Sequence, residues 1–250
     1  MLLTSKTAII TGGLGHQGRE EVRLFLQEGA NVISVDTAAP DPGAFLDVGE
    51  AAEHLLMLEA DVSDEKAWPD VVERAASQFG RIDILVNNAG ISSSSFGDEF
   101  DAHGWQQIID VNLKGAFLGI ASALPYMVRQ SSGSIVNISS IGALAGLPAG
   151  HLGYSASKGG LGAMSRTIAV RYGSRGVRCN TVYPGVMPAM RSSKDTSGAR
   201  GNRDSVLAAT PLARAGSAIE VARAVAFLAS DQASYISGAD LTIDGGFVAG

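Results

Sequence analysis

The first 36 residues contain the pattern that most restricts the fold of this chain. Residues 6–11 and 32–36 are apolar runs typical of buried strands, and residues 19–28 have the periodicity of a helix. The glycine-rich stretch 12–18 joins the first strand to the helix, and Asp36 ends the second strand. This order of strand, glycine turn, helix and acid-terminated strand is typical of units that bind dinucleotides.

Each part of this unit has a chemical use. Glycines let the backbone approach a pyrophosphate, and the N-terminus of the helix attracts its negative charge. Asp36 can accept hydrogen bonds from the adenosine ribose hydroxyls and would repel a 2′-phosphate. Thr37 follows Asp36 and no arginine stands beside it in the sequence, although Arg19 lies near the turn, so the sequence predicts NAD rather than NADP. The residues of the turn expected to contact the cofactor are Gly12, Gly15, His16, Gln17 and Gly18.

Strands and helices alternate through the rest of the chain, which predicts a single α/β domain over residues 1–250. We expect a Rossmann-like, doubly wound parallel sheet of about seven strands, with helices on both faces and ligands at the carboxyl ends of the strands. The further strands are expected at 55–62, 82–90, 133–140, 177–183 and 239–244, and the further helices at 67–79, 102–130, from 154 to about 172, and 217–230. Residues 186–212 look irregular, and we expect them to form a substrate-binding loop.

Several polar and small residues fall at strand ends. Asp61 is placed to meet an adenine edge, with Val62 against the ring; Asp61 also suits the capping of the helix that follows. The small residues after the fourth strand either leave room for a cofactor or simply lead into a loop. They are Asn88, Ala89 and Gly90.

Tyr154 and Lys158 are four residues apart in a predicted helix, which places both side chains on one face. A free tyrosine loses its proton near pH 10, but an adjacent ammonium stabilises the phenolate, so the pair predicts a lowered tyrosine pKa. A tyrosine tuned in this way can exchange a proton with a substrate. Taken alone, the same spacing also fits an ordinary amphipathic helix.

Charge and cysteine content exclude several classes of protein. The net charge of −6 argues against nucleic-acid or membrane-surface partners. The single cysteine, Cys179, lies in an apolar run, so we expect a buried thiol and no internal disulfide. No apolar run approaches the length of a membrane span, and a strand begins almost at the N-terminus, leaving no room for a signal peptide. We therefore expect a soluble cytoplasmic protein without a metal site.

With these features the chain resembles the short-chain dehydrogenase/reductase family over its whole length of 250 residues. The matching elements are Thr11-Gly12 to Gly18, Asp36, Asp61-Val62, Asn87 to Gly90, Asn112, Ser139-Ser140, Tyr154-x-x-x-Lys158, Pro184-Gly185 and Asp244-Gly-Gly246. The resemblance implies a catalytic tetrad, carried over to Asn112, Ser140, Tyr154 and Lys158, and cofactor contacts from Pro184, Gly185, Val186 and Met187. It also implies a homotetramer.

The chain departs from the family pattern at two positions. His16 stands where the family has the middle glycine of the turn, so either the turn places its positive-φ residue elsewhere or His16 adopts that conformation at a cost. Ala189 stands where the family often has a threonine that contacts the cofactor. Neither position belongs to the tetrad.

The resemblance implies an NAD-dependent oxidoreductase that interconverts a secondary alcohol and a ketone. Two alternatives stay open: a catalytically retired regulatory or scaffolding protein that binds nucleotide, and an NADP-dependent ketoreductase. The basic residues of the 186–212 segment fit either an anionic substrate or a solvated loop, and His151 faces either the substrate or water. These basic residues are Arg191, Lys194, Arg200 and Arg203.

Overall fold

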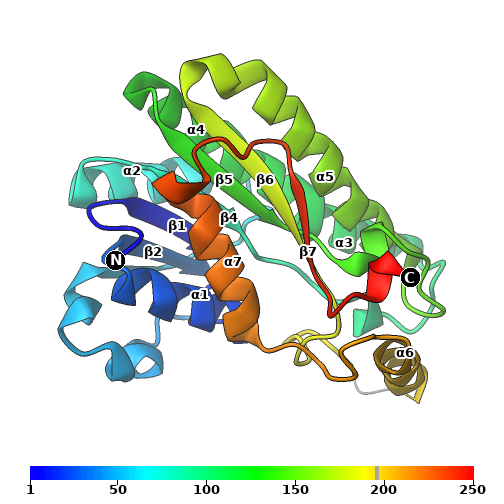
Figure 1. Ribbon diagram of the computed structural model, residues 1–250. Coiled ribbons are helices and arrows are strands. Elements are labelled where there is room, and N and C mark those ends of the chain that lie inside the picture. The colour runs from blue at the N-terminus through cyan, green and yellow to red at the C-terminus, as the bar shows by residue number, and fades with distance from the viewer. Residues whose placement is uncertain (195–196) are drawn as a thin grey trace.

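Seven parallel strands form the centre of the molecule in the computed structural model, which describes residues 1–194 and 197–250 (Figure 1). Their order across the sheet is β3-β2-β1-β4-β5-β6-β7, and every neighbouring pair is parallel. The predicted doubly wound α/β architecture is therefore confirmed. The strands are β1 (Thr7–Thr11), β2 (Asn31–Asp36), β3 (Leu55–Glu59), β4 (Ile84–Asn87), β5 (Gly133–Ile138), β6 (Val177–Pro184) and β7 (Asp240–Ile243).

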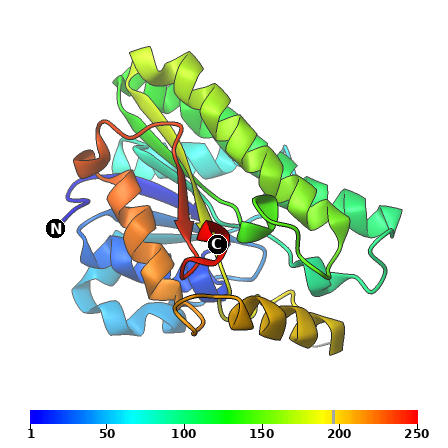
Figure 2. The same ribbon diagram turned by 45° about the vertical axis from the view of Figure 1, so that its right-hand side comes forward.

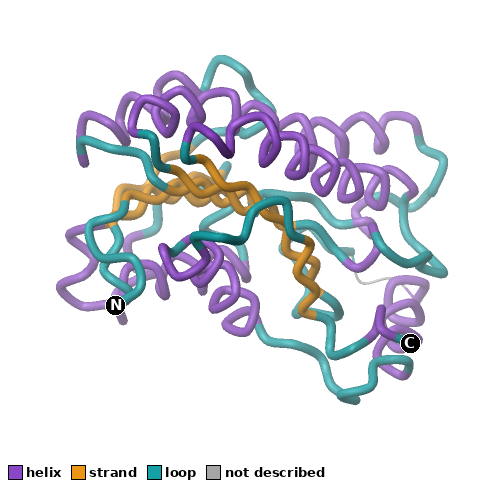
Figure 3. The backbone as a smooth tube through the Cα atoms, turned by 45° about the horizontal axis from the view of Figure 1, so that its top comes forward, coloured by secondary structure: helices purple, strands orange, loops and turns teal. Residues whose placement is uncertain are grey.

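Helices cover both faces of the sheet (Figure 3). On one face lie α1 (His16–Gln27) and α7 (Ala218–Ala229), and on the other lie α2 (Trp68–Phe79), α4 (Gly115–Gln130) and α5 (Leu152–Tyr172). The short helix α3 (Ala102–Ile109) precedes α4, and α6 (Ser197–Ala208) stands apart from both layers (Figure 2). Segment 186–212, predicted to be irregular, thus contains a helix. No sequence pattern indicated it, because residues 197–208 include two glycines and have no clear apolar stripe.

Two apolar cores form because successive strand residues point to opposite faces. Ile10 and Val32 pack toward α1 and α7, whereas Ile9 and Ile33 pack toward α2 and α4. Cys179 on β6 is fully buried, as predicted. Since β1 is buried along its whole length, its sequence is a continuous apolar run that lacks alternation.

The helix from Ala102 to Gln130 is continuous and contains one π-helical turn, Asp110–Lys114, between α3 and α4. By length and composition it could span a membrane, but half of its most apolar window is buried inside the protein. A core helix of a globular protein has these same properties, and this helix packs against β4, β5 and α2.

The strand order reverses beside β1, which positions the site. From β1 the chain moves outward through β2 and β3, and then returns to place β4 on the other side of β1. The turns after β1 and β4 therefore separate at the carboxyl edge of the sheet and leave a crevice there, which is where open α/β sheets bind their ligands.

Candidate active site

A groove with a cavity volume of about 1130 Å³ runs along the carboxyl edge of the sheet. The segments that follow β1 to β6 line it, together with the first two turns of α5. The groove contains every residue predicted to bind the cofactor, and three of the four predicted catalytic residues: Ser140, Tyr154 and Lys158. The fourth, Asn112, is buried beside it.

The glycine turn after β1 brings the backbone close to the floor of the groove. Gly12 has φ of +67°, and a Cβ there would lie 2.9 Å from Cα of Ala89, so only glycine fits. A side chain at Gly18 would collide with the carbonyl oxygen of Gly12. His16 begins α1 in helical conformation and is exposed, so the turn needs no positive φ at this position.

Side-chain hydrogen bonds join this turn to the end of β4. The hydroxyl oxygen of Thr11 accepts the N–H groups of Asn88 (3.1 Å) and Ala89 (3.0 Å), while the Asn88 amide donates to the carbonyl of Thr11 at 2.9 Å. Gln17 in turn donates to Asn88 at 3.2 Å. The turn after β1 and the segment after β4, which form the two sides of the crevice, are therefore held at a fixed separation. Gly90 comes next in the chain after Ala89, on the open side of the crevice.

Asp36 lies at the end of β2 with its carboxylate almost fully buried. It accepts hydrogen bonds from the N–H groups of Leu14 and Ala38, both at 3.0 Å, which fix its orientation toward the groove. The sequence shows no arginine next to Asp36, but the fold brings one there: the guanidinium of Arg191 is 2.7 Å from the carboxylate. This corrects the premise that Asp36 has no basic neighbour.

Asp61 and Val62 line the groove just beyond β3. Asp61 accepts hydrogen bonds from both the N–H (2.9 Å) and the hydroxyl (2.8 Å) of Ser63, so it stabilises a turn. It does not cap the helix that follows, because α2 begins only at Trp68, after Ala67. Its place at the groove leaves the predicted contact with an adenine edge as a prediction.

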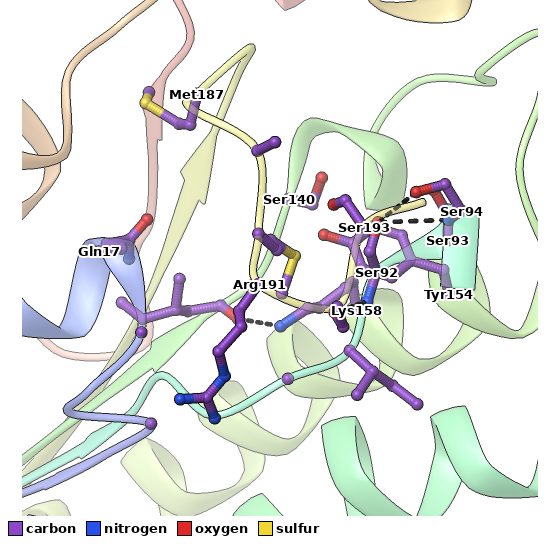
Figure 4. Close-up of a pocket in the computed structure, with 18 of the residues that line it drawn as sticks. Gln17, Ser92, Ser93, Ser94, Ser140, Tyr154, Lys158, Met187, Arg191 and Ser193 are labelled. Carbon is purple, nitrogen blue, oxygen red and sulfur yellow. Dashed lines mark hydrogen bonds between the residues drawn. The ribbon is translucent and has the colours of Figure 1, made fainter. Parts of the chain in front are cut away.

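Helix α5 carries Tyr154 and Lys158 on the face directed at the groove (Figure 4). Ser140 lies close enough to the Tyr154 hydroxyl to affect the pKa of the phenol. The ammonium of Lys158 lies 5.9 Å from the centroid of the Tyr154 ring and donates to the carbonyl of Ile138 at 2.7 Å. Three elements, β5, the turn after it and α5, thereby meet at one point.

Burial changes the acid–base properties of both groups. Burial of the Tyr154 phenol raises its pKa, and the nearby Ser140 hydroxyl only partly opposes this. Burial lowers the pKa of Lys158 to about 8. The sequence predicted a lowered tyrosine pKa, but the net shift in this structure is upward, because desolvation is its largest cause and the Lys158 ammonium bonds to the Ile138 carbonyl and not to the phenol.

Ser139 and Ser140 differ in what their hydroxyls do. The Ser139 hydroxyl is buried and donates to the carbonyl of Lys158 at 2.8 Å, which ties β5 to α5. The Ser140 hydroxyl accepts the N–H of Gly142 at 3.2 Å and lies near the Tyr154 phenol. The Ser139 hydroxyl is committed to the backbone of α5, so Ser140 is the better placed of the two serines to meet a substrate oxygen.

Asn112 sits in the π-helical turn and holds the chain that follows β4. Its side chain accepts the N–H of Ile91 at 2.8 Å and donates to the carbonyl of Ile91 at 3.1 Å. A Cβ added at Gly90 would lie 3.2 Å from the Asn112 oxygen and 3.4 Å from the Lys158 nitrogen, so both groups flank Gly90. A π-helical turn inside an α-helix is a feature often found at functional sites.

His151 is buried and caps the N-terminus of α5. Its Nδ1 accepts the N–H of Gly153 at 3.0 Å, and its Nε2 lies 3.0 Å from the carbonyl oxygen of Asp101. Since Nδ1 must accept and Nε2 must donate, the ring is a neutral imidazole with its hydrogen on Nε2. His151 therefore does not point at water, one of its two predicted positions; it fixes the helix that carries Tyr154.

The segment after β6 crosses the groove. Pro184, Gly185, Val186 and Met187 line it, as expected from the sequence, and Ala189 is exposed. Farther along, the Ser192 hydroxyl accepts the N–H of Ser92 at 2.9 Å, and the Ser192 carbonyl accepts the Ser95 hydroxyl at 2.9 Å. Neither these contacts nor the one between Arg191 and Asp36 had a local sequence signal. The predicted basic position Arg200 belongs to those whose side chain is not described.

The donor groups along the groove fit a dinucleotide. The N-terminus of α1 has no side-chain cap, so its first N–H groups are free to bind a pyrophosphate. The glycine turn leaves the space that such a group needs, and Asp36 supplies a carboxylate for ribose hydroxyls. Within residues 1–194 and 197–250, no cluster of three or more His, Cys, Asp or Glu side chains could hold a metal ion.

Known proteins share both the sequence and the fold. The profile of the family described as enoyl-(acyl carrier protein) reductase matches residues 17–248. The chain is 37% identical to the 3-oxoacyl-(acyl-carrier-protein) reductase FabG of Thermotoga maritima, over 99% of this chain and 100% of that protein. It is 36% identical to a 3-alpha-(or 20-beta)-hydroxysteroid dehydrogenase of Mycobacterium bovis, over 99% and 91%. The crystal structure of levodione reductase superposes with a TM-score of 0.88, at 34% identity over 99% of each chain.

Proposed function

This chain belongs to the short-chain dehydrogenase/reductase family, and we propose that it catalyses the NAD-dependent interconversion of a secondary alcohol and a ketone. Its named relatives are dehydrogenases and reductases, and the chain is an oxidoreductase that acts on CH–OH groups. The observation that carries the proposal is the meeting of Tyr154, Ser140 and Lys158 at the groove.

Tyr154 is the proton donor for ketone reduction and the proton acceptor for alcohol oxidation. Ser140, whose side chain lies near the phenol, holds the substrate oxygen against Tyr154. A phenol with a raised pKa stays protonated at neutral pH, which suits the donor role. The nicotinamide, when bound, gives or takes the hydride, while the protein supplies position and charge.

Lys158 binds the nicotinamide ribose and holds positive charge near the phenolate. Its ammonium is anchored on the Ile138 carbonyl and flanks Gly90 together with Asn112. Asn112 supports the turn at Ile91, and we propose that this π-helical turn positions a water that links Lys158 to solvent. A proton lost from Tyr154 would then be replaced from outside the groove.

In this proposal each turn of the groove binds one part of NAD. The residues 12–18 turn and the start of α1 bind the pyrophosphate, Asp36 binds the adenosine ribose, and Asp61 with Val62 contacts the adenine. Asn88, Ala89 and Gly90 leave room for the nicotinamide side of the cofactor. The residues that cover the nicotinamide are Pro184, Gly185, Val186 and Met187. The carboxylate of Asp36 supports NAD over NADP because it would repel a 2′-phosphate.

The substrate enters beside Tyr154, where the segments after β4 and β6 line the groove. Ser93 and Ser193 lie here, next to apolar groups such as Phe96 and Leu147, so the pocket offers both hydroxyl and apolar contacts. The chain works as a cytoplasmic homotetramer in this proposal, and the exposed Phe117 on α4 supplies apolar surface for assembly. No nucleic acid or membrane takes part.

The test is a spectrophotometric screen at 340 nm. Purified protein is incubated with a panel of secondary alcohols and ketones, each with NAD(H) and with NADP(H). The proposal expects turnover with at least one pair and a preference for NAD(H). Binding of NADH without turnover of any member of the panel would favour a retired, nucleotide-binding regulator.

A further inference from the structure

Two consecutive residues hold the segment after β6 across the groove. We call residues 186–194 the strap. Arg191 in the strap donates to Asp36 at 2.7 Å, and the two residues are 155 positions apart in the chain. Ser192 bonds to the turn after β4 through Ser92 and Ser95, each at 2.9 Å. The strap is therefore hydrogen-bonded to both sides of the groove, to the end of β2 on one side and to the segment after β4 on the other.

Figure 4 shows the Arg191 side chain reaching into the groove between the helix of Gln17 and the helix of Lys158. The Asp36 end of this ion pair is buried, with 4% of its side chain exposed, whereas the Arg191 end is 55% exposed. One partner is thus part of the fixed sheet edge. The other is a surface residue outside the two apolar cores.

The hydrogen bonds of Asp36 leave too few acceptor positions for a ribose. A carboxylate offers about four lone-pair sites. Oδ2 accepts the N–H of Leu14, and Oδ1 accepts both the N–H of Ala38 and the guanidinium of Arg191. One site remains, but the two adjacent hydroxyls of a ribose need two. Arg191 must therefore leave Asp36 before both hydroxyls can be accepted.

We propose that Arg191 sets the choice between NAD and NADP, an inference that rests on the dinucleotide site proposed above. Arg191 competes with the ribose of NAD for Asp36 and so weakens NAD binding. Once displaced, its guanidinium stays beside the ribose and can form a bidentate pair with the 2′-phosphate of NADP. The preference for NAD is therefore smaller than Asp36 alone would produce.

The test compares dissociation constants of NADH and NADPH, measured by nucleotide fluorescence, for the wild type and three variants. Arg191→Gln removes the guanidinium, and Arg191→Lys keeps the charge. Lys194→Gln removes one charge from the same strap and is the matched control, since Lys194 has no contact with Asp36 among the hydrogen bonds and ion pairs of the described residues. Each protein is measured at low and high NaCl.

Arg191→Gln is expected to bind NADH several-fold more tightly and NADPH several-fold more weakly, so that the ratio of the two constants changes at least about tenfold. The difference from the wild type should shrink at high NaCl, because salt screens the exposed guanidinium. Arg191→Lys keeps the positive charge but loses the bidentate fork, so its ratio should fall between those of the wild type and Arg191→Gln. Lys194→Gln should leave the ratio unchanged.

An unchanged ratio in Arg191→Gln, or weaker binding of NADH, would overturn the inference. An equal change of the ratio in Lys194→Gln would also overturn it, because the effect would then come from general charge. If the wild type binds neither nucleotide, the proposed function itself fails, and this result cannot be confused with an unchanged ratio.

Discussion

Lys158 lies 5.9 Å from the centre of the Tyr154 ring, one helical turn away on α5, and its ammonium hydrogen-bonds to the backbone of β5. The lysine therefore acts on the phenol across space, without a direct bond to its oxygen. Because burial raises the pKa of the phenol, the groove holds Tyr154 in its protonated form at neutral pH.

This relationship predicts opposite pH dependences for the two directions of the reaction. Alcohol oxidation needs the phenolate, whose fraction rises about tenfold per pH unit below the pKa of Tyr154. Between pH 6 and 8, below the pKa of Lys158, kcat/KM for an alcohol should therefore rise with pH, and that for a ketone should not. A flat profile for the alcohol over this range would contradict the assignment of Tyr154 as the base.

Asn112→Ala should lose both stability and activity. The change leaves the N–H and carbonyl of Ile91 without their partner, which costs about 1–3 kcal/mol of unfolding free energy. Asn180→Ala is a matched control, since Asn180 is equally buried and holds the backbone of Ile236 and Ala239 in the same way, away from the groove. Chemical denaturation and initial rates measure the two effects. Equal activity in the two variants would show that Asn112 has only a structural role.

His151→Ala should lower both stability and kcat, because α5 loses its N-terminal cap and the helix carries Tyr154. The expected loss is about 1–2 kcal/mol in unfolding free energy, measured by thermal or urea unfolding. His151→Asn retains an acceptor for the N–H of Gly153 and should recover most of the rate. A full rate in His151→Ala would mean that the cap does not position Tyr154.

Glu21→Gln should stabilise the protein at high pH. Glu21 is buried in α1, one carboxyl oxygen accepts from Gln17, the other has no partner among the described residues, and burial raises its pKa to about 8. The folded state thus binds a proton that the unfolded state releases above pH 4.5, so stability falls as pH rises from there to about 8. The variant should gain roughly 2 kcal/mol at pH 9 and little at pH 5.

Urea unfolding across this pH range measures the effect. Glu20→Gln, on the exposed side of the same helix and paired with Arg23, is the control and should show no such trend. A constant difference between Glu21→Gln and the wild type from pH 5 to 9 would show that Glu21 is ionised in the folded protein throughout.

The local periodicity of the sequence predicted most of the fold and most of the residues that line the groove. Parallel strands buried on both faces have continuous apolar sequences, and their carboxyl ends must meet at one edge, so Asp36, Gly90 and Ser140 could be placed together without coordinates. Helical spacing likewise placed Tyr154 and Lys158 on one face.

Long-range contacts and burial could not be read in the same way. Arg191 reaches Asp36 only because the strap folds back over the groove, and the path of such a segment has no periodic signal. The ring of His151 is fixed by a carbonyl 50 positions earlier in the chain. For Tyr154, the sequence reveals the neighbouring cation, but the extent of desolvation follows from the packing of distant segments.

The most direct test of the account is the Tyr154→Phe variant. It removes one hydroxyl and leaves the ring and the groove in place. With the best substrate from the 340 nm screen, turnover should fall by about 10²-fold or more, while the dissociation constant for NADH stays close to that of the wild type. Turnover at the wild-type rate would contradict the role of Tyr154 as the acid and base of this site.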